Sequence, residues 1–373
     1  MPLIINEEQQ MLKTSAKEFL KENSPISKLR WLRDTQDAIG YDKVLWQKMV
    51  DMGWTALTIP EAYGGLEFGY TGLGQILEET GKTLTASPLV STVLLGATAI
   101  NLGGNVLQKE TWLPQIAAGE LVIGFALEEG KHHSPNQLST VAKATADGYV
   151  LHGKKVAVID GHVADKLLVA ANTDTGVELF IVDAIAKGVS IERVITMDSR
   201  NYANVQLKEV AVKENAKLAS YKSGAALLDK TLDIGRIGLA AEMLGGIQEA
   251  FERTIAYLKE RQQFGKRIGS FQGLQHRAAH MFCEIEMCKS AVIKALKAID
   301  EDSEELPRLA SLAKAKLGQT YQLVSNEGIQ MHGGIGMTDE EEIGFFKKRA
   351  SVVQRLLGDS NFHLNRLGRM KGI

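Results

Sequence analysis

The sequence LDIGRIGLAAEMLGGIQEAFERTIAYLKERQQFGKRIGSFQ, residues Leu232–Gln272, decides how the rest of the chain is interpreted. In its first part, apolar side chains recur at a spacing of three to four residues: Ile237, Ala240, Ala241, Leu244, Ile247, Phe251, Ile255 and Leu258. This periodicity predicts one long helix with a single buried stripe.

The end of this stretch is cationic. Lys259, Arg261, Lys266 and Arg267 surround Gly265, a residue that can adopt the left-handed conformation in which many helices end. Cations suit the negative end of a helix dipole, so an ordinary solvated helix end accounts for them. Arginine also presents a planar fork of donors that matches phosphate oxygens, so the same cluster could hold a phosphate.

A second stretch favours the phosphate interpretation. Residues Gln330–Gly336 read QMHGGIG, and adjacent glycines let the backbone approach a ligand and expose N–H groups to a phosphate. In order and separation, the runs Arg261–Gly265 (RQQFG), Phe271-Gln272 and Gln330–Gly334 (QMHGG) resemble motifs of the acyl-CoA dehydrogenase family. The resemblance extends over nearly the whole chain.

Size and composition indicate a multidomain globular protein. The 373 residues are too many for one compact core and predict two or three domains. An apolar content of 45% and a charged content of 24% are typical of soluble proteins, and a net charge of −2 gives no reason to expect nucleic acid or an anionic membrane as partner. We see no apolar run long enough to cross a bilayer and no secretory leader, so a cytoplasmic location is expected.

No metal site is predicted. Cys283 and Cys288 lie on different faces of one predicted helix, so neither a disulfide nor a metal site is expected from them. His132 and His133 are adjacent in a polar loop without a spaced carboxylate or cysteine partner, and solvent exposure is the favoured interpretation.

The hydrophobic patterns divide the chain into three domains of an α+β protein. Residues 1–118 predict an N-terminal helical domain, whose first helix is capped by Asn6. Residues 119–213 predict a small antiparallel β domain of sandwich or barrel type, with strands at Val122–Leu127, Tyr149–His152, Lys155–Ile159, Lys166–Ala171, Glu178–Val182 and Val189–Val194. Residues 214–373 predict a four-helix bundle with helices at about 221–262, 272–300, 306–332 and 341–369.

The family resemblance implies a cofactor and residues that bind it. In acyl-CoA dehydrogenases, flavin adenine dinucleotide (FAD) lies at a subunit boundary. The resemblance implies that Arg261 and Gln263 bind the pyrophosphate of a neighbouring subunit's FAD, with Phe264 and Gln272 near its adenosine half. It also implies that the same half is lined by Gln330, Met331, His332, Gly333 and Gly334. The implied substrate is an acyl-CoA, and the implied electron acceptor is an electron-transfer flavoprotein.

The two stretches that hold the flavin ring in the family are altered. The family usually has Thr-Glu-Pro-x-x-Gly-Ser-Asp after the first middle strand, whereas residues 128–135 here read EEGKHHSP. The second stretch, usually Trp-Ile-Thr after a lysine, reads KVAVID at residues 155–160, and Asp160 lies near the position of a flavin-facing hydroxyl.

Both family positions for the catalytic base lack a carboxylate. The family's reaction removes the proton α to the thioester carbonyl while a hydride leaves the β carbon, which requires a carboxylate base and an oxyanion hole. The usual Glu position falls on Leu357, and the second position, on the long helix, falls on Gly235. Asp359 is a candidate substitute, although on a regular helix it would point roughly 200° away from the usual position.

Other charged residues near these motifs have simpler explanations. Acidic side chains often begin a helix, which accounts for Glu340, Glu341 and Glu342. Asp233 and Arg236 are interpreted as a structural or CoA-side polar contact, and are therefore candidate substrate-binding residues.

Three hypotheses follow. In the favoured one, this chain resembles the base-lacking subunit of heteromeric bacterial acyl-CoA dehydrogenases, in which two unlike subunits share one flavin site. The chain keeps the residues that would bind the adenosine half of a neighbouring subunit's FAD. It lacks the residues that would hold a flavin ring of its own and the catalytic base. The alternative is a self-sufficient homotetramer with a relocated base such as Asp359. The least favoured is a scaffold protein without flavin, which would leave Arg261 and the glycine-rich loop unexplained.

Overall fold

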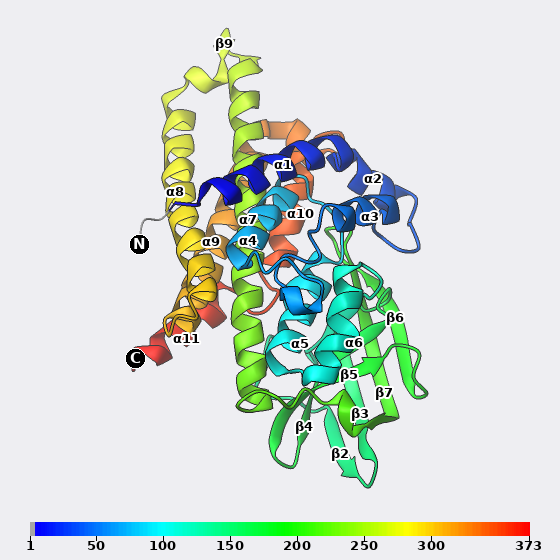
Figure 1. The fold of residues 1–373 in the computed structure, drawn as a ribbon. Helices are drawn as coiled ribbons and strands as arrows, with labels where there is room; N and C mark the ends of the chain where they lie inside the picture. Colours follow the sequence, from blue (N-terminus) through cyan, green and yellow to red (C-terminus); the bar gives the residue numbers. More distant parts are fainter. Residues whose placement is uncertain (1–3) are drawn as a thin grey trace. The chain divides into compact units, whose positions relative to one another are not determined.

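The computed structural model describes residues 4–373, which form two compact units (Figure 1). Of the described residues, the helical unit comprises 4–31, Tyr70–Thr85 and Arg236–Ile373, and the mixed unit comprises Leu32–Gly69 and Ala86–Gly235. The long helix α7, Gly224–Glu260, contributes to both, because the boundary falls between Gly235 and Arg236.

Helices build the first part of the chain, as predicted. The helix α1 begins with a capping box: the Asn6 side chain accepts from the Gln9 backbone N–H at 2.8 Å, and the Gln9 side chain accepts from the Asn6 N–H at 3.0 Å. The predicted cap is therefore confirmed. The elements in order are α1 (Glu7–Asn23), α2 (Ile26–Asp34), α3 (Lys43–Asp51), the 3₁₀ turn η1 (Glu61–Tyr63), α4 (Tyr70–Lys82), the π-helix η2 (Leu89–Ala97), α5 (Thr98–Gly103) and α6 (Val106–Ala117).

The middle of the chain forms one sheet. Its strands are β1 (Ile123–Ala126), β2 (Val141–Thr145), β3 (Gly148–Ile159), β4 (Lys166–Thr173), β5 (Gly176–Asp183), β6 (Val189–Ile195) and β7 (Asn201–Lys213), followed by the 3₁₀ turn η3 (Glu214–Ala216). The strand order is β1-β4-β2-β3-β7-β6, with β5 paired to β4. The strands predicted from the sequence did not include β2 and β7, and two separate strands were predicted where the structure has the single strand β3.

The sheet is mixed rather than wholly antiparallel, which corrects the prediction. Strand β1 runs parallel to β4, with Phe125 opposite Leu168, and also meets β3 antiparallel at Ile159. Parallel neighbours cannot be joined by a tight hairpin, and here the whole of β2 and β3 separates β1 from β4 in sequence. One face of the sheet buries a core that includes Leu151 and Phe180.

The last part of the chain carries the predicted helices with two differences. After α7 come β8 (Gln262–Gln263), β9 (Lys266–Arg267), η4 (Ile268–Ser270), α8 (Gln272–Asp300), α9 (Leu306–His332), η5 (Gly333–Met337), α10 (Ile343–Val353) and α11 (Ser360–Met370). The helix α7 ends at Glu260, so Gly265 lies in a hairpin turn and does not terminate the helix. The helix predicted at 341–369 is divided into α10 and α11, because Leu357 and Gly358 have φ of 54° and 103°, outside the helical region.

Two glycines let α4 and α7 touch backbone to backbone in the helical unit. A Cβ added at Gly81 would lie 1.9 Å from the carbonyl oxygen of Glu242, and one at Gly245 would lie 1.7 Å from that of Glu78. No larger residue fits at either position.

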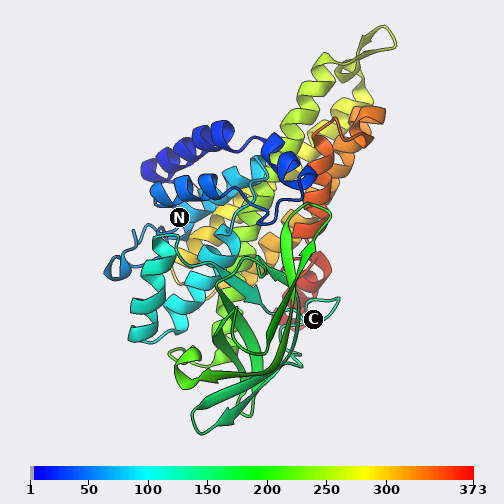
Figure 2. The same ribbon diagram turned by 90° about the vertical axis from the view of Figure 1, so that its right-hand side faces the viewer.

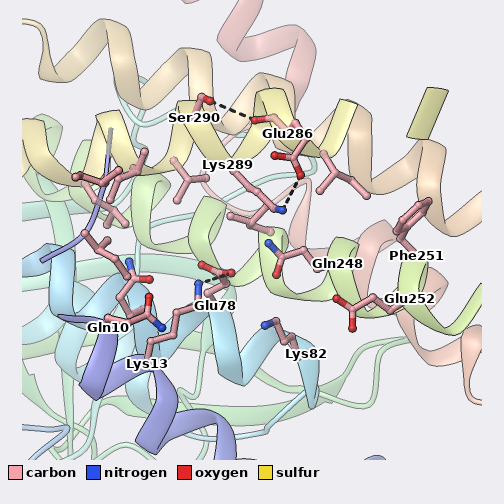
Figure 3. A pocket seen from close by; sticks show the side chains of 18 of the residues that line it. Gln10, Lys13, Glu78, Lys82, Gln248, Phe251, Glu252, Glu286, Lys289 and Ser290 are labelled. Carbon is pink, nitrogen blue, oxygen red and sulfur yellow. Dashed lines mark hydrogen bonds and ion pairs between the residues drawn. The ribbon is translucent and has the colours of Figure 1, made fainter. Parts of the chain in front are cut away.

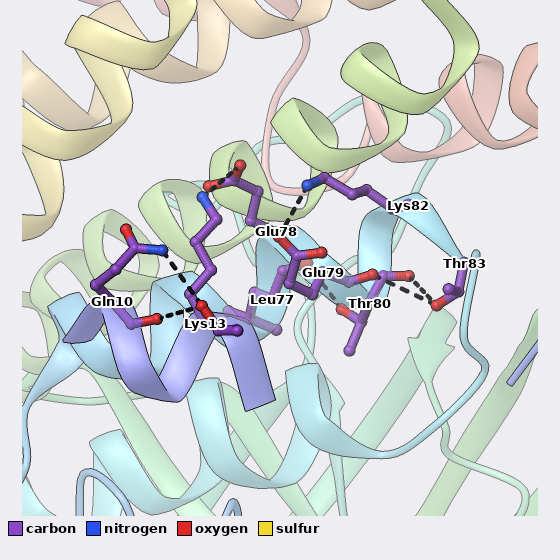
Figure 4. A network of polar contacts seen from close by, with 9 residues as sticks. Gln10, Lys13, Leu77, Glu78, Glu79, Thr80, Lys82 and Thr83 are labelled. Carbon is purple, nitrogen blue, oxygen red and sulfur yellow. Dashed lines mark hydrogen bonds and ion pairs between the residues drawn. The ribbon is translucent and has the colours of Figure 1, made fainter. Parts of the chain in front are cut away.

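Beside this crossing, Lys13 of α1 pairs with Glu78 of α4 at 2.8 Å, and Lys82 pairs with Glu79 at 2.8 Å (Figure 4). Burial raises the pKa of Glu79, and the bond from Lys82 opposes that rise. The Lys13–Glu78 pair joins α1 to α4, and the Lys82–Glu79 pair lies within α4.

Candidate functional site

The cationic end of α7 continues into a short hairpin. The Arg261 N–H donates to the Tyr257 carbonyl at 2.9 Å, and the Arg261 carbonyl accepts from the Ile268 N–H at 2.9 Å, which closes the hairpin at its base. Its turn residues, Phe264 and Gly265, have φ of 55° and 77°, the left-handed pair that tight two-residue hairpins require. Figure 2 shows this hairpin projecting beyond the neighbouring helix ends.

The hairpin presents its side chains to solvent. Phe264 is 89% exposed, and Arg261 and Gln263 are exposed beside it. The Phe264 ring meets the Phe271 ring edge-on at 6.1 Å between centroids, and Gln272 follows as the exposed first residue of α8. The tip therefore leaves an aromatic ring and a guanidinium accessible from solvent.

The glycine-rich loop forms a corner at the end of α9. Gly333 has φ 64° and ψ −140°, a conformation that is essentially restricted to glycine. A Cβ added at Gly333 or at Gly334 would meet no atom within 4 Å. Gln330 is exposed, whereas Met331 and His332 are 5% and 4% exposed. The open face of the corner therefore consists of Gln330, Gly333 and Gly334, and the other two predicted residues point into the unit.

The structure brings the hairpin and the corner together. The rings of Tyr257, one helical turn before Arg261, and His332, which directly precedes Gly333, are stacked with centroids 4.4 Å apart and an angle of 24° between their planes. Two motifs that are about 70 residues apart in sequence thus share one end of the helical unit.

The position to which the resemblance assigns the catalytic base carries a buried aliphatic side chain. Leu357 is 3% exposed, and its loop is held by donors that bind backbone carbonyls. Arg236 Nε donates to the Leu357 carbonyl at 3.0 Å and His363 Nε2 to the same oxygen at 3.1 Å. Lys314 Nζ donates to the carbonyls of Gln354 at 2.8 Å and Gly358 at 3.0 Å.

Burial governs the ionisation of this cluster. Burial, together with the nearby charge of Arg236, lowers the pKa of Lys314 to about 7, and Asp359 opposes the shift. The neutral and the charged amine can both donate to the two carbonyls, so the loop keeps its anchor across this pKa.

The remaining candidate site residues, Asp359, Asp233 and Arg236, either cap a helix or are buried. Asp359 caps α11, since its side chain accepts from the Phe362 N–H at 2.8 Å, and it is exposed. Asp233 is 2% exposed and Arg236 is 1% exposed, and Arg236 contacts the Leu357 loop and lies 5.5 Å above the Phe362 ring.

The two altered flavin-ring stretches lie in the mixed unit, where an ion pair holds them together. Lys155 Nζ donates to a Glu129 carboxylate oxygen at 2.7 Å and to the Leu127 carbonyl at 3.1 Å, and the Lys155 side chain is fully buried. Burial lowers the pKa of Lys155, and the bond to Glu129 opposes that shift. Sequence reasoning missed this pair, although a lysine within a predicted apolar strand was a signal for it.

The resemblance places carboxylates at or near two positions in these stretches where the family has hydroxyls. Glu128 replaces the threonine of the family pattern, and its Oε1 lies 2.5 Å from Nδ1 of His133, which replaces a glycine. Asp160 accepts from the Ser91 hydroxyl at 2.6 Å. These side chains add negative charge and bulk where the family has small polar groups.

A cavity of about 800 Å³ lies elsewhere in the helical unit, among α1, α4, α7 and α8 (Figure 3). Its rim carries charged residues such as Lys13, Glu78, Glu286 and Lys289, which pair with one another. Its apolar wall includes Phe251. None of the predicted site residues lines it.

Comparisons with known proteins identify the family. The family model of the acyl-CoA dehydrogenase N-terminal domain matches residues 6–120, and the family model of the C-terminal domain matches residues 222–371. The short/branched chain specific acyl-CoA dehydrogenase of Rattus norvegicus is 30% identical over 97% of this chain and 85% of its own. The caffeyl-CoA reductase-Etf complex subunit CarC of Acetobacterium woodii is 27% identical over 91% of this chain and 92% of its own.

Solved structures agree. The Tcur3481-Tcur3483 steroid ACAD variant superposes with a TM-score of 0.90 at 30% identity, covering 98% of each chain. Butyryl-CoA dehydrogenase from Megasphaera elsdenii superposes with a TM-score of 0.91 at 27% identity over all of both chains. The chain belongs to the acyl-CoA dehydrogenase family, a family of flavoprotein oxidoreductases.

The residues of this chain fit one half of an FAD molecule better than the other. The open glycine corner leaves room for a pyrophosphate against backbone N–H groups, with Arg261 one helical turn beyond the ring stack. The flavin-ring stretches carry Glu128 and Asp160, whose negative charge opposes a reduced, anionic flavin.

Among residues 4–373, no helix is both long and apolar enough to span a membrane.

Proposed function

We propose that this chain is the cofactor-lending subunit of a heteromeric, FAD-dependent acyl-CoA dehydrogenase. The observation that carries the proposal is the pairing of an exposed Arg261 hairpin and an open glycine corner with a buried Leu357 at the base position. The chain would bind the adenosine half of an FAD whose flavin ring lies in a sister subunit. That subunit would also supply the carboxylate base.

Each of the exposed residues has a role that its chemistry allows. The Arg261 guanidinium would form charge-assisted bonds to the pyrophosphate, and Gln263 would add a neutral donor. The N–H groups of Gly333 and Gly334 would approach the same oxygens, since no side chain stands in their way. Phe264, with Gln272 and Gln330 nearby, would cover the adenosine. Bound FAD would supply the hydride acceptor for α,β-desaturation of an acyl-CoA.

The comparisons support a heteromeric assembly. The structure named as a Tcur3481-Tcur3483 steroid ACAD is a pair of differently named chains, and the Acetobacterium relative is named as a subunit of an Etf complex. We therefore propose an acyl-CoA substrate, a heterotetramer with a sister subunit, and an electron-transfer flavoprotein as electron acceptor. A cytoplasmic location stays a prediction.

The alternative, a self-sufficient homotetramer with Asp359 as base, has one observation in its favour. The turn before Asp359 is not regular helix, so the direction of its side chain is not set by helical geometry. However, Asp359 already caps α11 and is exposed, whereas a general base of this reaction needs a desolvated carboxylate.

The test is co-expression with a sister dehydrogenase and a visible spectrum of the purified product. We expect the chain alone to be colourless and the mixed complex to be yellow, with one flavin per unlike pair. Arg261→Gln should strip FAD from the complex, and the matched control Lys259→Gln, which removes an exposed charge from the same helix end, should not. A yellow homotetramer that bleaches with an acyl-CoA would refute the proposal.

Asp359→Asn separates the two candidates. Asparagine caps a helix as well as aspartate does, so the variant should fold normally while losing any basic carboxylate. Under the proposal, turnover of the mixed complex is unchanged. A loss of turnover with normal FAD content would instead support the self-sufficient enzyme.

A further inference from the structure

Helices α7 and α9 run side by side and in the same direction toward the candidate site. A Cβ added at Gly246 of α7 would lie 2.2 Å from the Tyr321 hydroxyl oxygen of α9. Further along, a Cβ added at Gly328 of α9 would lie 3.2 Å from Oγ1 of Thr254. These contacts advance together along both helices, and Figures 1 and 2 show the two helices lying together up to their C-terminal ends.

The stack of Tyr257 on His332 is the last contact of this series. The two rings lie 4.4 Å apart, one turn beyond Thr254 and Gly328. The His332 ring is fixed in turn, because its Nδ1 donates to the Gly328 carbonyl at 2.7 Å and the side chain is buried. The next turn of α7 brings Arg261, and the next residue of α9 is Gly333.

The hairpin depends on this stack for its direction. In the described chain, its two strands pair with each other, the Ile268 N–H donates to the Arg261 carbonyl, and the Arg261 N–H donates back to the Tyr257 carbonyl of α7. Its side-chain contacts run to Phe271, which Phe264 meets edge-on and which lies 4.3 Å below Lys266 Nζ. All of these contacts are local, so the last turn of α7 decides where the Arg261 guanidinium points.

We infer that Tyr257 and His332 are positioning residues that fix the Arg261 hairpin against the Gly333–Gly334 corner, so that both reach one pyrophosphate. This inference rests on the proposed function. The guanidinium and the backbone N–H groups share a ligand only if their separation is fixed, so a displaced hairpin loses the charge-assisted bonds of Arg261 to the pyrophosphate. Neither ring has to touch the cofactor for this role.

The test measures FAD affinity in the complex with the co-expressed sister subunit. Tyr257→Leu removes the flat ring and keeps an apolar side chain, and we expect the dissociation constant for FAD to rise by about 10- to 100-fold, as for the loss of a hydrogen bond to a charged group. Tyr257→Phe keeps the stack and should restore affinity to within about threefold of the wild type. The matched control is Phe251→Leu, which removes an aromatic ring from the same helix, where it pairs with Phe282 at 6.5 Å.

The outcomes separate the positioning role from general destabilisation and from the proposed function. Equal weakening by Phe251→Leu and Tyr257→Leu would overturn the positioning role, because any loosening of α7 would then suffice. Loss of affinity in Tyr257→Phe would overturn it too, because the hydroxyl and not the stack would be responsible. Wild-type affinity in Tyr257→Leu together with lost affinity in Arg261→Gln would refute the inference alone. Wild-type affinity in Arg261→Gln would refute the proposed function.

Discussion

The ion pair between Glu242 of α7 and Arg349 of α10 allows a quantitative test of how the helical unit is held together. Arg349 Nε lies 2.9 Å from Glu242 Oε1 and Nη2 lies 3.0 Å from Oε2, and the two side chains are only 6% and 7% exposed. Glu242→Gln would remove the carboxylate charge that faces the buried Arg349 guanidinium at these distances. Removing one partner of such a pair costs about 3–5 kcal/mol, because the remaining charge stays desolvated.

The assay is urea unfolding followed by the helical circular dichroism signal. The matched control is Glu286→Gln on α8, whose partner Lys289 lies at 2.6 Å, but with both side chains 46% exposed. Water screens that pair, so its loss should cost less than about 1 kcal/mol. Glu242→Gln combined with Arg349→Met should regain part of the lost stability, because no unpaired charge remains. Equal losses in Glu242→Gln and the control would refute the reasoning.

Three further outcomes follow from the described geometry. Gly333→Ala should destabilise the chain by about 1–3 kcal/mol in thermal unfolding, because its conformation is strained for any other residue. Gly334→Ala should leave the melting temperature unchanged but weaken FAD binding to the mixed complex, since its added Cβ meets no protein atom and enters the open face of the corner. Burial lowers the pKa of Lys314 from 10.5 to about 7, so between these values the unfolded chain binds more protons than the folded chain. Stability of the wild type relative to Lys314→Met should therefore rise from pH 7 to pH 10 in urea midpoints, and a constant difference would contradict the shift.

The sequence predicted the long helices well because their signals are local. The start of α8 at Gln272 and the end of α9 at His332 coincide with the predicted bounds. The predicted role of Gly265 was wrong. It was interpreted as the end of the long helix, whereas Phe264 and Gly265 form a hairpin turn after α7 has ended. Both structures need a residue with positive φ, so the glycine alone does not distinguish them.

The missed features depend on contacts between distant residues. The strand β7, Asn201–Lys213, is recognised by pairing with β3 and β6, and Glu209 interrupts its alternation with a φ of 51°. The break at Leu357 depends on donors from α7, α9 and α11, and bulky residues rarely adopt its φ of 54°. The exposure of Phe264 followed only from the family resemblance, which places it near a neighbouring subunit's cofactor, because residue type alone favours burial of an aromatic side chain.

The exposed hairpin has a consequence for how the chain would be maintained in a cell. A monomer presents Phe264 and the basic residues Arg261, Lys266 and Arg267 on a small, locally supported projection. Such projections are where proteases cut first, and trypsin-like enzymes cleave after basic residues. Under the proposed heteromeric assembly, we expect a copy made in excess of its sister subunit to be degraded from this tip, so that turnover as well as synthesis would match the abundance of the two chains.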